Sequence, residues 1–155
     1  MVRWSLAVVL LLTSLGSSGC RRPPKVNQYD QEALEHLVSS FPAIAKMDTN
    51  GYVNDLKLEG GQVTDEALDH VARLIDLKSL SLFGSAISDQ GLEKLQPLEK
   101  LEALGLGGTR ITDRGLVVLH KVPTLRWVWL PQKTVTPQAV NELKQAIPGL
   151  TVHYQ

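Results

Sequence analysis

A repeat of 24 residues is the feature that most limits how this chain can fold. The apolar pattern Leu-x-x-Leu-x-Leu recurs at this interval, with Val replacing Leu in places. Its copies start at Val53, Leu77, Leu101, Leu125 and, in a divergent form, Gly149. A unit of this length cannot bury its apolar side alone, so successive units are expected to stack on one another. The repeat therefore predicts one continuous domain over residues 53–155.

Each unit has a strand part and a helix part. In the first part the apolar residues alternate with others, which is typical of a short strand with one buried face. The expected strands are 54–58, 78–82, 102–106, 126–130 and 151–154. In the second part apolar residues such as Leu92, Leu95 and Leu98 recur every third position, which suits a short helix. We therefore expect an α/β domain of parallel strands with helices outside.

The first three helical parts start with a Ser or Thr followed by an acidic residue, and the fourth starts with Thr136-Pro137. The recurring acidic residues are Asp65, Asp89 and Asp113. We expect Ser88 and Thr112 to cap their helices, and the carboxylates to lie at the positive N-terminal ends. A small residue two positions further on, such as Gly91, predicts close packing of the helix against the neighbouring unit. Because catalytic carboxylates need different environments, this uniform row is interpreted as structural.

The run from Leu104 to Leu116, with its Ile-Thr-Asp-x-Gly-Leu segment, resembles leucine-rich repeat proteins. It is similar to the subtype found in F-box-associated repeats and in bacterial surface lipoproteins. The resemblance implies a ribonuclease-inhibitor-like, right-handed α/β solenoid, a horseshoe fragment with parallel strands on the concave face and short helices on the convex face. Ser85 and Thr109 stand where that family usually has an asparagine ladder, and their hydroxyls are expected to bond neighbouring backbone.

Residues 29–52 are predicted to form an N-terminal cap made of a helix and a hairpin. Four apolar residues share one helical face: Ala33, Leu34, Leu37 and Val38. Phe41-Pro42 is expected to end that helix and 43–47 to form a strand. Asn50-Gly51 predicts a two-residue hairpin turn, which would place Lys46 opposite Asp55.

Residues 1–19 are predicted to be a signal peptide. Met1-Val2-Arg3 is a short basic start, and Trp4 to Leu15 is an almost unbroken apolar run. Such a run reaches about 18 Å as a helix, against about 30 Å of bilayer hydrocarbon. The small residues Gly16 to Gly19 follow, as at a cleavage site.

Cys20, the only cysteine, comes directly after these small residues. The arrangement resembles bacterial lipoprotein signals, which implies that Cys20 is lipidated and that the exported protein is anchored to a membrane. Residues 20–28, with Arg21-Arg22-Pro23-Pro24, are interpreted as a tether. Ordinary cleavage after Gly19, giving a secreted or periplasmic protein, and an uncleaved anchor are the alternatives.

Several classes of function find no support in the residues. The 16 basic and 16 acidic side chains give a net charge of +0, so no electrostatic footprint for nucleic acid exists. One cysteine excludes a cysteine-based zinc site. The histidines, which are predicted to lie scattered on the surface, are His36, His70, His120 and His153. We therefore expect no metal, no cofactor and no catalytic site.

The binding hypothesis concerns the sheet face on which no helix is expected. Trp127 and Trp129 are two apart on one predicted strand, so both should project to this face. Small neighbours such as Gly105 are expected to leave the rings open. His153 would supply a polar rim and Phe83 would extend the apolar track. Trp is enriched at binding hot spots, so these four residues are the predicted site.

The function expected from these features is a non-catalytic module that binds a protein, a peptide or a glycan. Two alternatives remain open. One is a self-associating structural surface protein that uses its open C-terminal strand edge or the Trp face. The other, implied only by the repeat resemblance, is a ubiquitin-ligase-type substrate adaptor. The sequence leaves the oligomeric state open.

Overall fold

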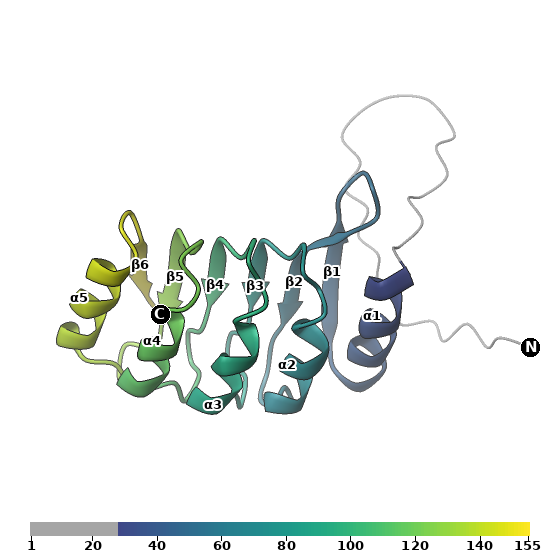
Figure 1. Ribbon diagram of the computed structural model, residues 1–155. Coiled ribbons are helices and arrows are strands. Elements are labelled where there is room, and N and C mark those ends of the chain that lie inside the picture. Colours follow the sequence, from purple (N-terminus) through teal and green to yellow (C-terminus); the bar gives the residue numbers. More distant parts are fainter. Residues whose placement is uncertain (1–27) are drawn as a thin grey trace, which may run out of the picture.

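The computed structural model describes residues 28–155, which form a mixed α/β structure (Figure 1). The predicted signal peptide and Cys20 lie outside these residues. The strands are β1 Ala43–Met47, β2 Val53–Leu58, β3 Ser79–Ser81, β4 Ala103–Gly105, β5 Trp127–Leu130 and β6 Thr151–Tyr154. The helices are α1 Gln28–Ser40, α2 Asp65–Val71, α3 Asp89–Leu92 with a 3-10 turn at Glu93–Leu95, α4 Asp113–Leu119 and α5 Pro137–Ala146.

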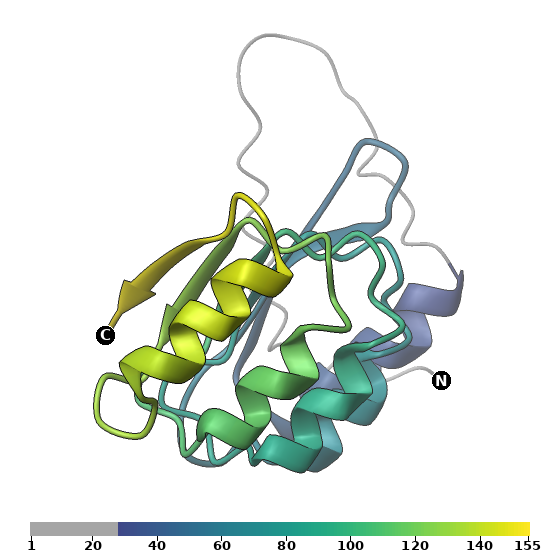
Figure 2. The same ribbon diagram turned by 60° about the vertical axis from the view of Figure 1, so that its left-hand side comes forward.

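All the strands belong to one six-stranded sheet in the chain order β1-β2-β3-β4-β5-β6. The strands from β2 to β6 are parallel, which confirms the predicted strands and their direction. Neighbouring parallel strands pair residues that are 24 positions apart in the sequence. Leu104, for example, pairs with Leu80 on one side and with Val128 on the other. The helices cover one face of the sheet (Figures 1 and 2), and we call the other one the open face.

The core lies between the sheet and the helices. The repeated leucines fill it, as Leu56, Leu80 and Leu104 are at most 1% exposed. The same rows continue through the helical parts with Leu68, Leu92 and their equivalents. Stacking therefore buries one apolar side of every unit in a single cluster.

The aspartate row has a role beyond the one expected from sequence. Asp89 lies in the first turn of α3, as predicted, but its carboxylate also accepts hydrogen bonds from the next unit. Thr112 donates to it through the backbone N–H at 2.8 Å and through the hydroxyl at 2.6 Å. Asp65 and Asp113 accept the same pair of bonds from Ser88 and Thr136. We call this set the aspartate ladder, and it ties each helical part to the next.

The predicted caps are correct in one of the two cases. The Thr112 hydroxyl accepts from the N–H of Arg114 at 3.3 Å, whereas Ser88 makes no side-chain cap bond. The hydroxyls of Ser85 and Thr109 donate to the carbonyls of Leu82 and Leu106, within their own turns. They satisfy local backbone there and do not bridge successive units.

The hairpin between β1 and β2 has the predicted register over most of its length. Lys46 pairs with Asp55, and their charged groups are 3.2 Å apart. The predicted two-residue turn is wrong, because the register shifts by one after Lys46. The Asp48 N–H donates to the Tyr52 carbonyl at 2.9 Å, which closes a three-residue loop. Gly51 takes the positive φ of 87° that such a loop requires at its last position.

Candidate functional site

The open face carries one side chain from every second position of each strand, and the parallel register arranges them in rows. Trp127 lies between Ala103 and Thr151 in one row. Trp129 lies between Gly105 and His153 in the next. The structure thus places both tryptophans side by side on one strand, as the alternation predicts.

Trp127 is the open part of this group. It remains 42% exposed, and the neighbour on its β4 side is an alanine that is too short to cover an indole. A large apolar side chain left this exposed on an ordered strand loses the free energy that its burial would supply, about 2 kcal/mol or more. Trp127 therefore presents an exposed apolar surface that a binding partner would bury.

Trp129 is more covered, because His153 stacks on it. The ring centroids are 5.4 Å apart and the planes differ by 21°. Direct pairing of the two residues across β5 and β6 holds the rings in this arrangement. His153 thus packs against the indole and does more than form the predicted polar rim.

Phe83 differs most from the expectation. Its ring lies over the glycines of the third unit, where an added Cβ would come within 3.0 Å of Phe83 Cε2 at Gly105 and 2.6 Å of Cε1 at Gly107. The space that Gly105 leaves beside Trp129 is therefore filled, and the prediction of an open ring on that side is wrong. The absence of side chains at Gly105 and Gly107 leaves the space that the Phe83 ring occupies.

We call the group of Trp127, Trp129, His153 and Phe83 the aromatic platform. It spans from the end of β3 to β6, since Phe83 reaches across β4 and His153 leans on Trp129. The opposite end of the open face is polar, with the Lys46–Asp55 ion pair and a 2.8 Å hydrogen bond from Ser81 Oγ to Glu59 Oε1.

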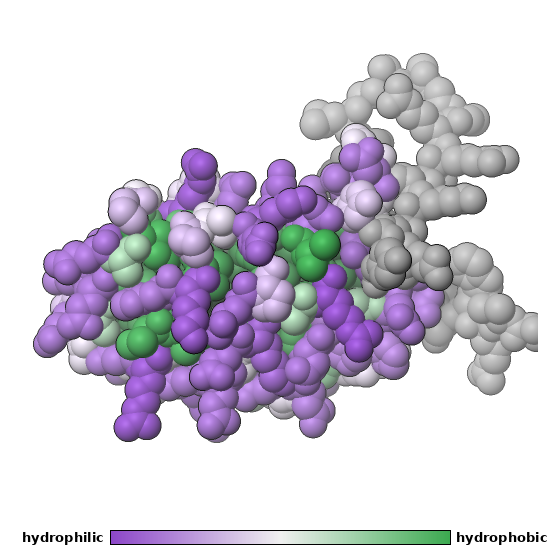
Figure 3. Space-filling view, viewed as in Figure 1, coloured by the Kyte–Doolittle hydropathy of each residue, from purple (hydrophilic) through white to green (hydrophobic). Residues whose placement is uncertain are grey.

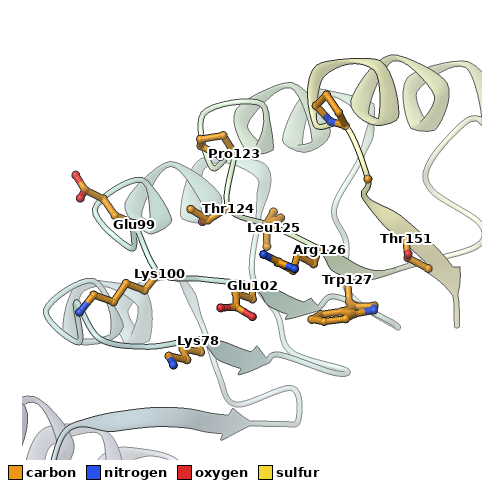
Figure 4. A pocket seen from close by; sticks show the side chains of 12 residues that line it. Lys78, Glu99, Lys100, Glu102, Pro123, Thr124, Leu125, Arg126, Trp127 and Thr151 are labelled. Carbon is orange, nitrogen blue, oxygen red and sulfur yellow. The ribbon is translucent and has the colours of Figure 1, made fainter.

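A groove of about 720 Å³ runs beside Trp127, along the edge of the sheet where the strands begin (Figure 4). Three charged residues line it at intervals of 24, each directly before a strand: Lys78, Glu102 and Arg126. Thr151 and Trp127 close its other side (Figure 4). The groove joins the exposed indole to an alternation of positive and negative groups.

Lys100 lies further along the same groove and has its own partner. Its ammonium donates to Asp76, and this hydrogen bond together with the charge of Asp76 raises the pKa of Lys100 above its usual range. Lys100 is thus already committed to an ion pair, while Arg126 is exposed next to Trp127.

Reasoning from the sequence missed this groove. The predicted strands 78–82, 102–106 and 126–130 begin with these three charged residues, but only the residues facing the open face were considered as a binding surface. The signal was present, because Lys78, Glu102 and Arg126 obey the same 24-residue spacing as the leucines. Charged residues at a fixed position of a stacked unit must lie in one line along the edge of the sheet.

Two of the four histidines lie together, so the prediction that they are scattered is wrong for His36 and His70. His36 of α1 stacks on His70 of α2 with centroids 4.8 Å apart and planes 13° apart. Nδ1 of His70 is buried and has no hydrogen-bond partner in the described part of the chain. His153 packs on Trp129, as given above.

The helix-covered face has a different character. Figure 3 shows hydrophilic side chains over most of it, with hydrophobic areas between them. Two large apolar residues away from the open face are well exposed, Ile75 at 59% and Val117 at 58%. A second, smaller groove lies between α3 and α4 and is lined mainly by polar residues such as Gln90 and Arg114.

Two further observations concern residues 28–155 alone. They contain no group of three or more His, Cys, Asp or Glu side chains placed to hold a metal ion. Within this same range, none of the helices has the length and apolar character needed to cross a membrane.

Neither the models of protein families nor the curated proteins contain a match to this chain.

Proposed function

We propose that this protein is a non-catalytic binding module that uses the aromatic platform and the adjoining groove to hold a protein, a peptide or a glycan. The observation that carries the proposal is Trp127, which is 42% exposed and borders a groove of about 720 Å³. Exposed aromatic residues beside charged groups are typical of binding hot spots.

The architecture that we infer for this module is a leucine-rich repeat solenoid over residues 53–155, with 29–52 as its N-terminal cap. The register of 24 residues between successive strands and the aspartate ladder support it. In this arrangement the open face is the concave one and the helices are on the convex one. The antiparallel β1 and the helix α1 cover the first unit, as a cap would.

Binding is favoured over catalysis by what the carboxylates do. Asp65, Asp89 and Asp113 each accept two hydrogen bonds from the next unit, in the same geometry. A general acid and a general base need environments that separate their pKa values, and three equivalent sites do not provide them. The carboxylates are therefore assigned to holding the stack together.

The test compares three proteins: the parent, Trp127→Ala and Ile75→Ala. Ile75 is a matched control, because it is an exposed apolar residue outside the platform. Each protein is screened against displayed random peptides and against an immobilised glycan panel. We expect ligands of the parent to bind Trp127→Ala about 30-fold more weakly, which corresponds to about 2 kcal/mol at a hot spot.

The control should retain the affinity of the parent. Two results would contradict the proposal: an absence of any selective ligand in both screens, or ligands whose affinity is the same for the parent and for Trp127→Ala. Circular dichroism of the variant should match the parent, because this ring lies outside the core.

A further inference from the structure

The two edges of the sheet are unequal in their protection against pairing with another strand. β1 carries Lys46, whose side chain is 48% exposed, and its register is broken by a bulge after that residue. Charged side chains and bulges are the devices by which edge strands avoid further pairing. β6 has neither, since its sequence Thr-Val-His-Tyr contains no Lys, Arg, Asp or Glu and its register with β5 is regular.

The free groups of β6 can be assigned from its bonds to β5. The Thr151 N–H donates to the Arg126 carbonyl at 2.8 Å, and the Gln155 N–H to the Leu130 carbonyl at 2.9 Å. Peptide groups of successive residues in a strand point to opposite sides, so Val152 and Tyr154 direct theirs away from β5. Figure 2, with this end of the molecule turned forward, shows β6 beside α5 and no described segment across its edge.

We propose that this edge pairs with the β6 of a second copy of the chain, antiparallel and about a two-fold axis at His153. In this register Val152 lies opposite Tyr154 of the other copy, and all the outward N–H and C=O groups of both residues are paired. The side chains of both residues face the helix side. For them to meet, the two-fold axis must be perpendicular to the sheet, and the open faces of the two copies then form one continuous surface.

The side chains fit this occupant. Tyr154 is 50% exposed and would pack on Val152 of the second copy, an aromatic and β-branched pair of the kind that stabilises sheets. No Lys, Arg, Asp or Glu occurs in residues 151–155, so self-pairing brings no like charges of these types together. On the open face the stacked pair Trp129–His153 would meet its counterpart, which extends the aromatic platform across the axis.

The first test uses disulfide trapping in the full chain with Cys20→Ser, so that an introduced cysteine is the only one. In the proposed register His153 faces itself in a pair without hydrogen bonds, with Cβ atoms about 4.5–5.5 Å apart. His153→Cys should therefore form a covalent dimer under mild oxidation. Thr151→Cys is the matched control, because it would face Gln155 and lie about 13 Å from its own counterpart.

We expect at least about tenfold more covalent dimer from His153→Cys than from Thr151→Cys, because a disulfide forms only between cysteines whose Cβ atoms are close together. Equal yields from both variants, or no dimer from either, would overturn the proposal. If a strand of another protein occupied this edge instead, neither variant would form the covalent dimer.

The second test measures self-association of the full chain by sedimentation in detergent at several concentrations. Tyr154→Pro removes an outward N–H that β5 does not use, so the fold should survive. We expect dimerisation to weaken about 30-fold in this variant, since each copy loses a bond, and to persist in Tyr154→Phe. A parent that stays monomeric at every concentration, or a proline variant that associates as the parent does, would refute the pairing.

Discussion

At the scale of single residues, the aspartate ladder explains why a small residue follows each ladder aspartate. A Cβ added at Gly91 would come within 2.2 Å of Asp65 Oδ1, and one at Gly115 within 2.5 Å of Asp89 Oδ1. These glycines therefore leave room for the carboxylate of the preceding unit. The first two steps of the ladder thus depend on the absence of a methyl group, whereas Ala139 occupies the equivalent position beside Asp113.

This contact reverses the usual effect of a glycine substitution in a helix. Replacing a helical Gly by Ala normally stabilises a protein by about 0.5–1 kcal/mol. Gly91→Ala should instead lower the free energy of unfolding by about 1–3 kcal/mol, as overpacking does. Denaturant unfolding of Gly91→Ala, Asp65→Ala and the double variant measures this. We expect the double variant to lose less free energy of unfolding than the two single variants lose together, because Asp65→Ala removes the carboxylate that the new methyl group meets. Strict additivity would count against the contact.

At the scale of elements, Asp30 joins α1 to the start of β2. It is 2% exposed, and its Oδ2 accepts the N–H of Val53 at 2.9 Å. Burial raises the pKa of the Asp30 carboxyl above its ordinary value of 3.8, and the charges of Asp76 and Asp48 act in the same direction. The bond from Val53 lowers the pKa, but the net shift is upward. The folded protein therefore holds this proton more tightly than the unfolded chain.

The sign of the resulting pH dependence follows by linkage. The contribution of Asp30 to stability is complete below its ordinary value of 3.8 and is lost as the pH rises through the raised folded pKa. Asp30→Asn keeps an oxygen acceptor for Val53 and cannot ionise. We expect the stability of this variant relative to the parent to increase from about pH 3 to about pH 7 in denaturant unfolding. A stability difference that is constant, or that decreases with pH, would show that burial does not disfavour the ionised form of Asp30.

At the scale of the whole molecule, the sheet separates two tasks. The helix side holds the units together through the leucine core and the aspartate ladder. The open face is free to vary, and it carries polar groups near β2 and the aromatic platform near β5. A stack of this kind can change its binding residues without changing its core, because alternate positions of each strand serve the two sides.

The lipid anchor at Cys20 that the lipoprotein-like signal implies makes a prediction for the intact protein. Cys20→Ser should move the protein from the detergent phase to the aqueous phase in phase partitioning, because the lipid would be lost with its thiol. Gly19→Ala keeps the thiol and serves as the control. Retention of the Cys20→Ser protein in the detergent phase would assign the anchor to residues 4–15 instead.

The sequence by itself determined the parallel strands, their register and the faces on which Trp127 and Leu104 lie, because a period of two within a period of 24 leaves a single consistent stacking. Only the tertiary structure decided what fills the spaces between units. Phe83 reaches over Gly105, His36 meets His70, and Asp89 binds Thr112 of the next unit. These contacts depend on side-chain rotamers and on distances across units, which no pattern along one chain encodes. The three-residue loop at Gly51 likewise depends on a bulge that pairing across two strands creates.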